Sequence, residues 1–87
     1  MTDPLTDELR SRIADQDRTI LAAVNMRLRL VAQLKAHKRE TGAAFVDPEQ
    51  EERLLQTLVD ANAGPLSEKG VRKLFEEILA LTKRELL

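Results

Sequence analysis

The sequence predicts an all-α fold of three helices, the first of them very long. Apolar residues recur along residues 6–41, mostly three or four positions apart, with no proline or glycine in that stretch. Two helix-start signals follow, at Asp47 and Ser67, and no segment shows the apolar–polar alternation of a strand. We expect the 87 residues to form one domain spanning residues 1–87, at the small end of the size range, where a chain buries little core by itself.

The first predicted helix begins at Thr6 as N-cap, carries Asp7 and Glu8 in its first turn, and ends before Gly42. A helix of about 35 residues is about 50 Å long, whereas a compact globule of this chain length has a radius of gyration of about 12 Å. The chain therefore cannot cover this helix alone. The helix also carries a second apolar strip, formed by Ala22, Ala23, Met26, Leu30 and Leu34. We expect a partner chain to cover it.

Local signals define the two shorter helices. Asp47 caps the second, Pro48 occupies its first position and Gln50 can complete a capping box, so we expect a helix from Pro48 to about Ala61. Residues 62–65 end it, and its buried stripe is Leu54, Leu55 and Leu58. Ser67 caps a third helix that continues to near Leu87. Its apolar side consists of Val71, Leu74, Phe75, Ile78, Leu79, Thr82 and Leu86.

Charge and composition restrict the class of partner. The net charge is −1, but residues 27–40 hold five basic side chains against one acidic. A nucleic-acid surface needs more basic groups and stacking aromatics, and this chain has two Phe, no Tyr and no Trp. No segment resembles a membrane span or a signal peptide, so we expect no membrane partner and a cytoplasmic location. A small anionic ligand suits the basic middle best.

Two cations in this basic stretch share one helix face. Arg27 and Lys38 are eleven residues apart, which brings them to within about 20° of each other around the helix. Val31 and Leu34 lie between them on that face. The pattern is typical of a site for a small dianion with a hydrocarbon middle. The alternative is two solvated cations whose long side chains lie over a core.

The residues for most catalytic devices are missing. The chain has no Cys, a single His and no glycine-rich phosphate loop or metal-ligand cluster, so we expect no metal and no cofactor. His37 sits in a polar run and is interpreted as a surface residue rather than a base. An enzyme with this inventory would have to use orientation and electrostatics.

Several motifs, in their order and spacing, resemble the all-helical class of chorismate mutases, and the resemblance covers nearly the whole chain. They are the ELRxxIxxxD opening from Glu8, with Asp15-Gln16-Asp17 at its acid position, the Met26-Arg27 step, the spacing to Lys38, the Val46-Asp47-Pro48-Glu49 helix start followed by Glu51, and NAGPLSEKGVRKLFEEI from Asn62. The resemblance implies an intertwined homodimeric helical bundle with two equivalent sites. It also implies the rearrangement of chorismate to prephenate without a cofactor, as a step of aromatic amino-acid biosynthesis.

The resemblance also implies roles for individual residues. Arg10 of the partner chain and Arg27 would hold the two carboxylates of the substrate, and Lys38 would contact a carboxylate and the ether oxygen. Asp47 through its backbone, and Glu51, would receive the substituent at ring carbon C4, while Thr82 would lie near a carboxylate. The catalytic residues implied are Arg27, Lys38 and Glu51. The remaining substrate-binding positions are Arg10, Asp47, Gln50, Thr82 and Leu86.

Two positions depart from the family pattern. Leu86 stands where the family usually has Gln or Glu, a second donor to the ether oxygen, and Gln50 stands where an Arg commonly precedes the helix-two glutamate. Leu86 can instead extend the apolar stripe, and Gln50 can be only a cap. Two alternatives therefore stay open. One is a mutase that acts on 4-amino-4-deoxychorismate in aromatic-antibiotic biosynthesis, because Gln50 makes an ammonium near Glu51 less unfavourable. The other is a catalytically weak regulatory module. An isochorismate-pyruvate lyase has no specific support.

Overall fold

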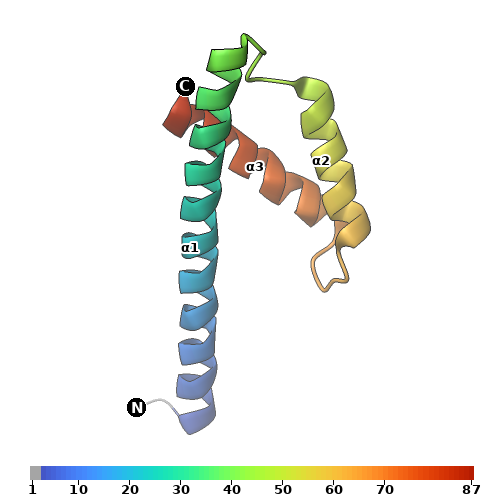
Figure 1. Ribbon diagram of the computed structural model, residues 1–87. Helices are drawn as coiled ribbons and strands as arrows, with labels where there is room; N and C mark the ends of the chain where they lie inside the picture. The colour runs from blue at the N-terminus through green and yellow to red at the C-terminus, as the bar shows by residue number, and fades with distance from the viewer. Residues whose placement is uncertain (1–2) are drawn as a thin grey trace. The chain divides into compact units, whose positions relative to one another are not determined.

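The computed structural model describes residues 3–87 and consists of three helices, with no strand in that range. They are α1 (Pro4–Thr41), α2 (Pro48–Ala61) and α3 (Glu68–Leu86), which Figure 1 shows in chain order from blue to red. The predicted all-α class with a very long first helix is confirmed. No helix in residues 3–87 carries an apolar stretch long enough to cross a membrane, and the predicted cytoplasmic location stays a prediction.

The start predicted for the first helix was wrong. Thr6 lies inside α1, and its amide and hydroxyl both donate to the carboxylate of Asp3, at 2.8 and 2.7 Å. Asp3 therefore caps α1, because its carboxylate accepts from an amide of the first turn that has no partner within the helix. Pro4, the first helical residue, has no amide hydrogen to leave unsatisfied.

The end of α1 follows the prediction. Gly42 adopts a φ of +76°, in the left-handed region that closes many helices. The amide of Ala43 then donates to the carbonyl of Lys38 at 3.0 Å, which is the six-residue bond of a Schellman motif. The turn that carries Lys38 is thereby held in helical form up to the end of the helix.

The bounds of α2 and α3 agree with the sequence signals. The carboxylate of Asp47 accepts from the amide of Gln50 at 3.2 Å, and the hydroxyl of Ser67 accepts from the amide of Gly70 at 3.0 Å. A capping box also requires the side chain of Gln50 to bond back to the amide of Asp47, and this second part of the prediction was wrong. The amide oxygen of Gln50 accepts from the guanidinium of Arg53, at 3.0 and 3.3 Å, because Arg53 is one turn further along the same helix.

The chain divides into two compact units, Met1–Val31 and Ala32–Leu87, so the single domain predicted for residues 1–87 stays a prediction. In the second unit, α2 packs against α3. Leu55 and Val71 are its buried hydrophobic residues, at 6% and 4% exposure, and Thr82 is its buried polar residue. Leu74, placed on the apolar side of the third helix from the sequence, is 47% exposed. The core between α2 and α3 is therefore small.

A charged side chain also joins α2 to α3. Arg72 on α3 reaches two residues of α2, pairing with the carboxylate of Glu52 at 3.0 Å and donating to the amide oxygen of Gln56 at 2.8 Å. The turn between the helices is closed by Asn62, whose side chain donates to the carbonyl of Leu66 at 2.7 Å. These contacts fix the pairing of α2 with α3.

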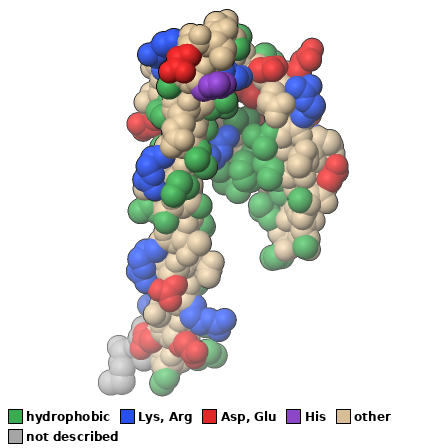
Figure 2. Space-filling view, in the orientation of Figure 1, with side chains coloured by type: hydrophobic (Ala, Val, Ile, Leu, Met, Phe, Trp, Pro, Cys, Tyr) green, Lys and Arg blue, Asp and Glu red, His purple; other side chains and the backbone are tan. Residues whose placement is uncertain are grey.

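The first unit is a helical segment that its own residues do not cover. No residue of α1 is buried, and Figure 2 shows hydrophobic side chains at the surface along α1, among basic and acidic ones. The large hydrophobic residues exposed in this segment are Leu5, Leu9, Ile13, Ile20, Leu21, Met26 and Leu30. Within its own unit, the first part of α1 therefore leaves its apolar residues uncovered.

Candidate active site

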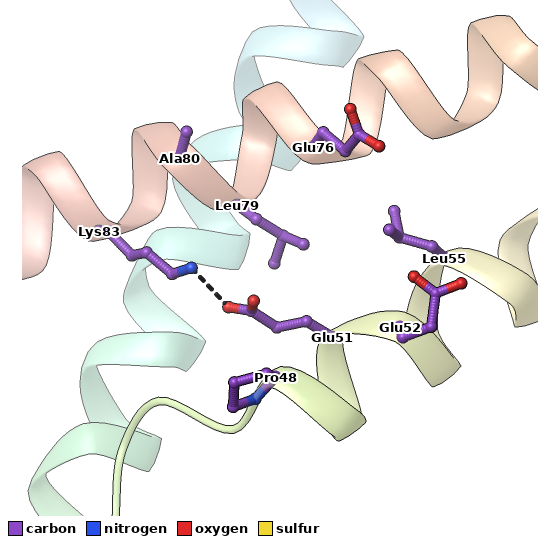
Figure 3. Close-up of a pocket in the computed structure, with 8 residues that line it drawn as sticks. All are labelled: Pro48, Glu51, Glu52, Leu55, Glu76, Leu79, Ala80 and Lys83. Carbon is purple, nitrogen blue, oxygen red and sulfur yellow. Dashed lines mark ion pairs between the residues drawn. The ribbon is translucent and has the colours of Figure 1, made fainter.

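A cleft of about 290 Å³ lies between α2 and α3 and contains one of the predicted catalytic residues, Glu51 (Figure 3). Each helix contributes side chains spaced three, four and seven residues apart, which places them on one helix face. Those from α2 are Pro48, Glu51, Glu52 and Leu55, and those from α3 are Glu76, Leu79, Ala80 and Lys83. Leucine side chains thus lie beside ionic groups in this cleft.

The ionic centre of the cleft is an ion pair between α2 and α3. The ammonium of Lys83 lies 2.9 Å from a carboxylate oxygen of Glu51, as the dashed line in Figure 3 marks. The two side chains are 39% and 27% exposed, so water reaches this pair less than it reaches the pairs on single helices, such as Lys73–Glu77 at 72% and 60%. Partial shelter from water strengthens such a pair relative to a fully solvated one.

The cleft by itself is acidic. Glu51, Glu52 and Glu76 line it and Lys83 is the one cation among its lining residues, all of which lie in the described chain. Glu52 is paired with Arg72, which does not line the cleft. The cations predicted to hold the carboxylates of a dianion, Arg27 and Lys38, are not among the residues that line this cleft. What it supplies is a carboxylate, Glu51, held at one oxygen by an ammonium.

A second cation links the end of α1 to α3 within the unit Ala32–Leu87. The ammonium of Lys35 donates to the backbone carbonyl of Leu86, and it also lies 6.0 Å from the centre of the Phe45 ring. The end of α3, which carries the predicted site residue Leu86, is thereby joined to the last turns of α1. Lys35 was not singled out from the sequence.

The predicted site residues fall in both units. Arg10 and Arg27 belong to Met1–Val31, and the others belong to Ala32–Leu87. Arg10, Asp47 and Gln50 are exposed, Arg27, Lys38, Glu51 and Leu86 are half-buried, and Thr82 is buried. Among the predicted residues in the described chain, the structure brings Asp47 into direct hydrogen-bond contact with Gln50.

Three predicted residues have specific local surroundings. Asp47 uses its side chain as a cap, and its backbone carbonyl accepts from the amide of Glu51 at 3.0 Å. Gln50 holds the guanidinium of Arg53 near the position where the family usually carries an Arg. The hydroxyl of Thr82 donates to the carbonyl of Ile78 at 2.7 Å, so donating to a substrate carboxylate would require that bond to be exchanged.

Lys83 is the residue that sequence reasoning missed. A signal for it was present, because Glu76, Leu79 and Lys83 recur at helical spacing and therefore share one face of α3. The same spacing places Glu51 beside Leu55 on α2. Which face of α2 meets which face of α3 does not follow from either pattern. In residues 3–87, no group of three or more His, Cys, Asp or Glu side chains is placed so that it could hold a metal ion.

Comparison with known proteins identifies the family. A family model described as chorismate mutase type II matches residues 9–85. Two solved structures of chorismate mutase from Thermus thermophilus are similar to the chain. Form I is 34% identical with a TM-score of 0.86, covering 88% of this chain and 96% of that one. Form II is 33% identical with a TM-score of 0.87, covering 91% and 90%.

No curated protein matches the chain significantly. The family model nevertheless spans both units and every predicted site position from Arg10 to Thr82, leaving only Leu86 outside. The three-helix order and the solved structures at more than 30% identity agree with it. The chain therefore belongs to the chorismate mutase type II family, an all-helical class of intramolecular transferases.

Proposed function

We propose that the chain catalyses the Claisen rearrangement of chorismate to prephenate, a step of aromatic amino-acid biosynthesis. The observation that carries this proposal is the match to the chorismate mutase type II model over residues 9–85, within which Arg10, Arg27, Lys38, Asp47, Glu51 and Thr82 all fall. The likeness to the Thermus thermophilus chorismate mutase over nearly the full length of both chains supports it.

The reaction requires no nucleophile and no proton relay. The ether C–O bond of the substrate breaks while a C–C bond forms within the same molecule, and negative charge develops on the enolpyruvyl oxygen. Holding the folded conformer removes part of the entropic barrier. A cation fixed at the ether oxygen stabilises charge that appears only in the transition state, which raises kcat. A chain that offers cations, carboxylates and apolar surface is suited to this chemistry.

The proposal assigns the substrate carboxylates to Arg27 and to Arg10 of a second copy, preferably in forked hydrogen bonds. Lys38 then contacts a carboxylate and the ether oxygen. Its turn is held in helical form by the Schellman motif at Gly42, and this supports a fixed position for its ammonium.

Other residues of the proposal receive the ring and the second carboxylate. Asp47 through its backbone, and Glu51, receive the C4 hydroxyl, and Thr82 lies near a carboxylate once its bond to Ile78 is exchanged. Leu86 supplies no donor to the ether oxygen. For that reason, we expect catalysis to depend on Lys38 more strongly than it would with a hydrogen-bond donor at position 86.

The proposal includes an intertwined homodimer. Its support is the exposed apolar surface along residues 5–30 of α1, which the unit Met1–Val31 does not cover by itself. A second copy is the simplest cover, since long first helices can pack on each other and bury both apolar strips. This arrangement is also what would bring Arg10 to a site formed mainly by the other chain.

The alternative substrate, 4-amino-4-deoxychorismate, is less well supported by the structure than by the sequence. In the sequence, Gln50 replaces a positively charged residue next to Glu51, which would make an ammonium at C4 less unfavourable. The ammonium of Lys83, 2.9 Å from Glu51, supplies a positive charge there. The neutral hydroxyl of chorismate is therefore the better fit, and chorismate remains the substrate of the proposal.

The direct test is to incubate the purified chain with chorismate and to follow its loss and the appearance of prephenate. We expect turnover by the wild type and a loss of at least about 100-fold in kcat/KM in Arg27→Ala, typical of a removed charge-stabilising donor. Arg29→Ala is the matched control, because Arg29 is an exposed arginine two residues along the same helix. Equal effects of the two substitutions, or no prephenate from the wild type, would overturn the proposal.

A further inference from the structure

The ion pair between Lys83 and Glu51 differs from the pair Arg72–Glu52, which joins the same two helices. Both connect α3 to α2, at 2.9 and 3.0 Å. Glu51 is 27% exposed, whereas Glu52 is 65% exposed and its partner Arg72 also holds Gln56. Lys83 therefore acts on the more sheltered carboxylate, in a cleft with Pro48, Leu55, Leu79 and Ala80 on its walls.

We infer that Lys83 is a positioning and specificity-determining residue, which orients the carboxylate of Glu51 and selects a neutral substituent at C4 of the substrate. This inference rests on the proposed function. Its physical basis is that the ammonium occupies one carboxylate oxygen and restricts the rotation of the Glu51 side chain, leaving the second oxygen to accept a hydrogen bond. A carboxylate held in this way is pre-organised for a hydroxyl donor.

The same geometry disfavours a cationic substituent. Two donors on one carboxylate each approach an oxygen at about 2.9 Å, so an ammonium on the substrate would lie within roughly 6 Å of the Lys83 ammonium. Like charges at that distance in a half-sheltered site repel. A neutral hydroxyl has no such cost. Glu52 and Glu76 line the cleft as well, but Glu52 is paired with Arg72 and so offers little compensation.

The test compares kcat/KM for chorismate and for 4-amino-4-deoxychorismate in each variant. The ratio of the two values is independent of the fraction of active protein, so a partly unfolded variant still gives an answer. In Lys83→Met we expect the ratio of chorismate to amino substrate to fall by at least about tenfold. The ratio in Lys83→Arg should stay within about threefold of the wild-type ratio, since this substitution retains the positive charge.

Two further variants separate charge from orientation and from structure. Lys83→Gln keeps a donor for Glu51 without the charge, so it should retain more of kcat on chorismate than Lys83→Met while losing the discrimination. Arg72→Met removes the neighbouring ion pair between the same helices and should lower the melting temperature without changing the ratio.

The outcomes are distinct. A wild type that converts chorismate and a Lys83→Met variant with an unchanged ratio would overturn this inference alone and leave Lys83 as a structural tie like Arg72. A ratio that changes equally in Arg72→Met would also overturn it. A wild type that converts neither substrate overturns the proposed function and this inference together.

Discussion

The ammonium of Lys35 donates to the backbone carbonyl of Leu86. This hydrogen bond between the end of α1 and the end of α3 therefore does not depend on which side chain residue 86 carries. The side chain of Leu86 is half-buried and offers no hydrogen-bond donor. Position 86 can therefore be changed while its main-chain contact is retained.

The substitution Leu86→Gln is expected to raise kcat on chorismate by about tenfold or more, because it restores a donor to the ether oxygen and such donors are typically worth about 2.7–4 kcal/mol. Steady-state kinetics would measure it. Leu87→Gln is the control, because Leu87 is 64% exposed and is the next residue along. A folded Leu86→Gln variant without any gain would mean that Lys38 alone stabilises the ether oxygen.

Assembly should depend on the apolar surface of α1. We expect sedimentation at micromolar concentration to give twice the chain mass for the wild type and a smaller mass for Ile20→Glu, since Ile20 is 60% exposed in the single chain and a charge there cannot be buried at low cost. Asn25→Glu, on another side of the helix, should leave the mass unchanged. A cooperatively folded wild-type monomer would contradict the homodimer.

Mixed dimers test whether Arg10 acts in the partner's site. The Arg10→Ala protein and the Arg27→Ala protein should each form homodimers that are inactive. When the two are mixed and allowed to exchange, one site of the mixed dimer collects both defects and the other has neither. We expect activity to appear on mixing, towards half the wild-type value per mixed dimer. No recovery after verified exchange would show that both arginines act from the same chain.

The start of α1 should be sensitive to acid. Hydrogen bonds from Thr6 hold the pKa of Asp3 below its usual value of 3.8. Because the folded-state pKa is the lower one, the cap stabilises the first turn above pH 3.8 and is lost as the pH falls through the folded-state pKa. The amide shift of Thr6 in NMR spectra should follow this titration. Asp3→Asn, which keeps an acceptor, should abolish the dependence, and an unchanged titration in that variant would contradict the assignment.

The parts of the fold predicted correctly rest on local chemistry. Asp47 followed by Pro48, and Ser67 three residues before Gly70, define helix starts through bonds within one turn, and the structure contains both bonds. The missed start of α1 has the same explanation, since Asp3-Pro4 repeats the Asp47-Pro48 pattern. A capping residue followed by proline is a stronger signal than Thr6 alone.

The parts that could not be predicted depend on how helices are rotated against each other. Helical spacing places Glu51 on one face of α2 and Lys83 on one face of α3, but their 2.9 Å contact requires those two faces to meet. The same holds for Lys35 and Leu86. The proposed role of Arg10 depends on a second chain and stays a prediction.

The small core between α2 and α3 makes the unfolding thermodynamics of this protein a matter of mass action. Leu55 and Val71 are the hydrophobic residues it buries, too few to offset the chain entropy of folding. In the proposed dimer, most of the stabilising burial would come from association, so unfolding and dissociation would form one transition. Each tenfold dilution would then lower the apparent free energy of unfolding by about 1.4 kcal/mol per dimer. The melting temperature would be a property of the concentration as much as of the sequence.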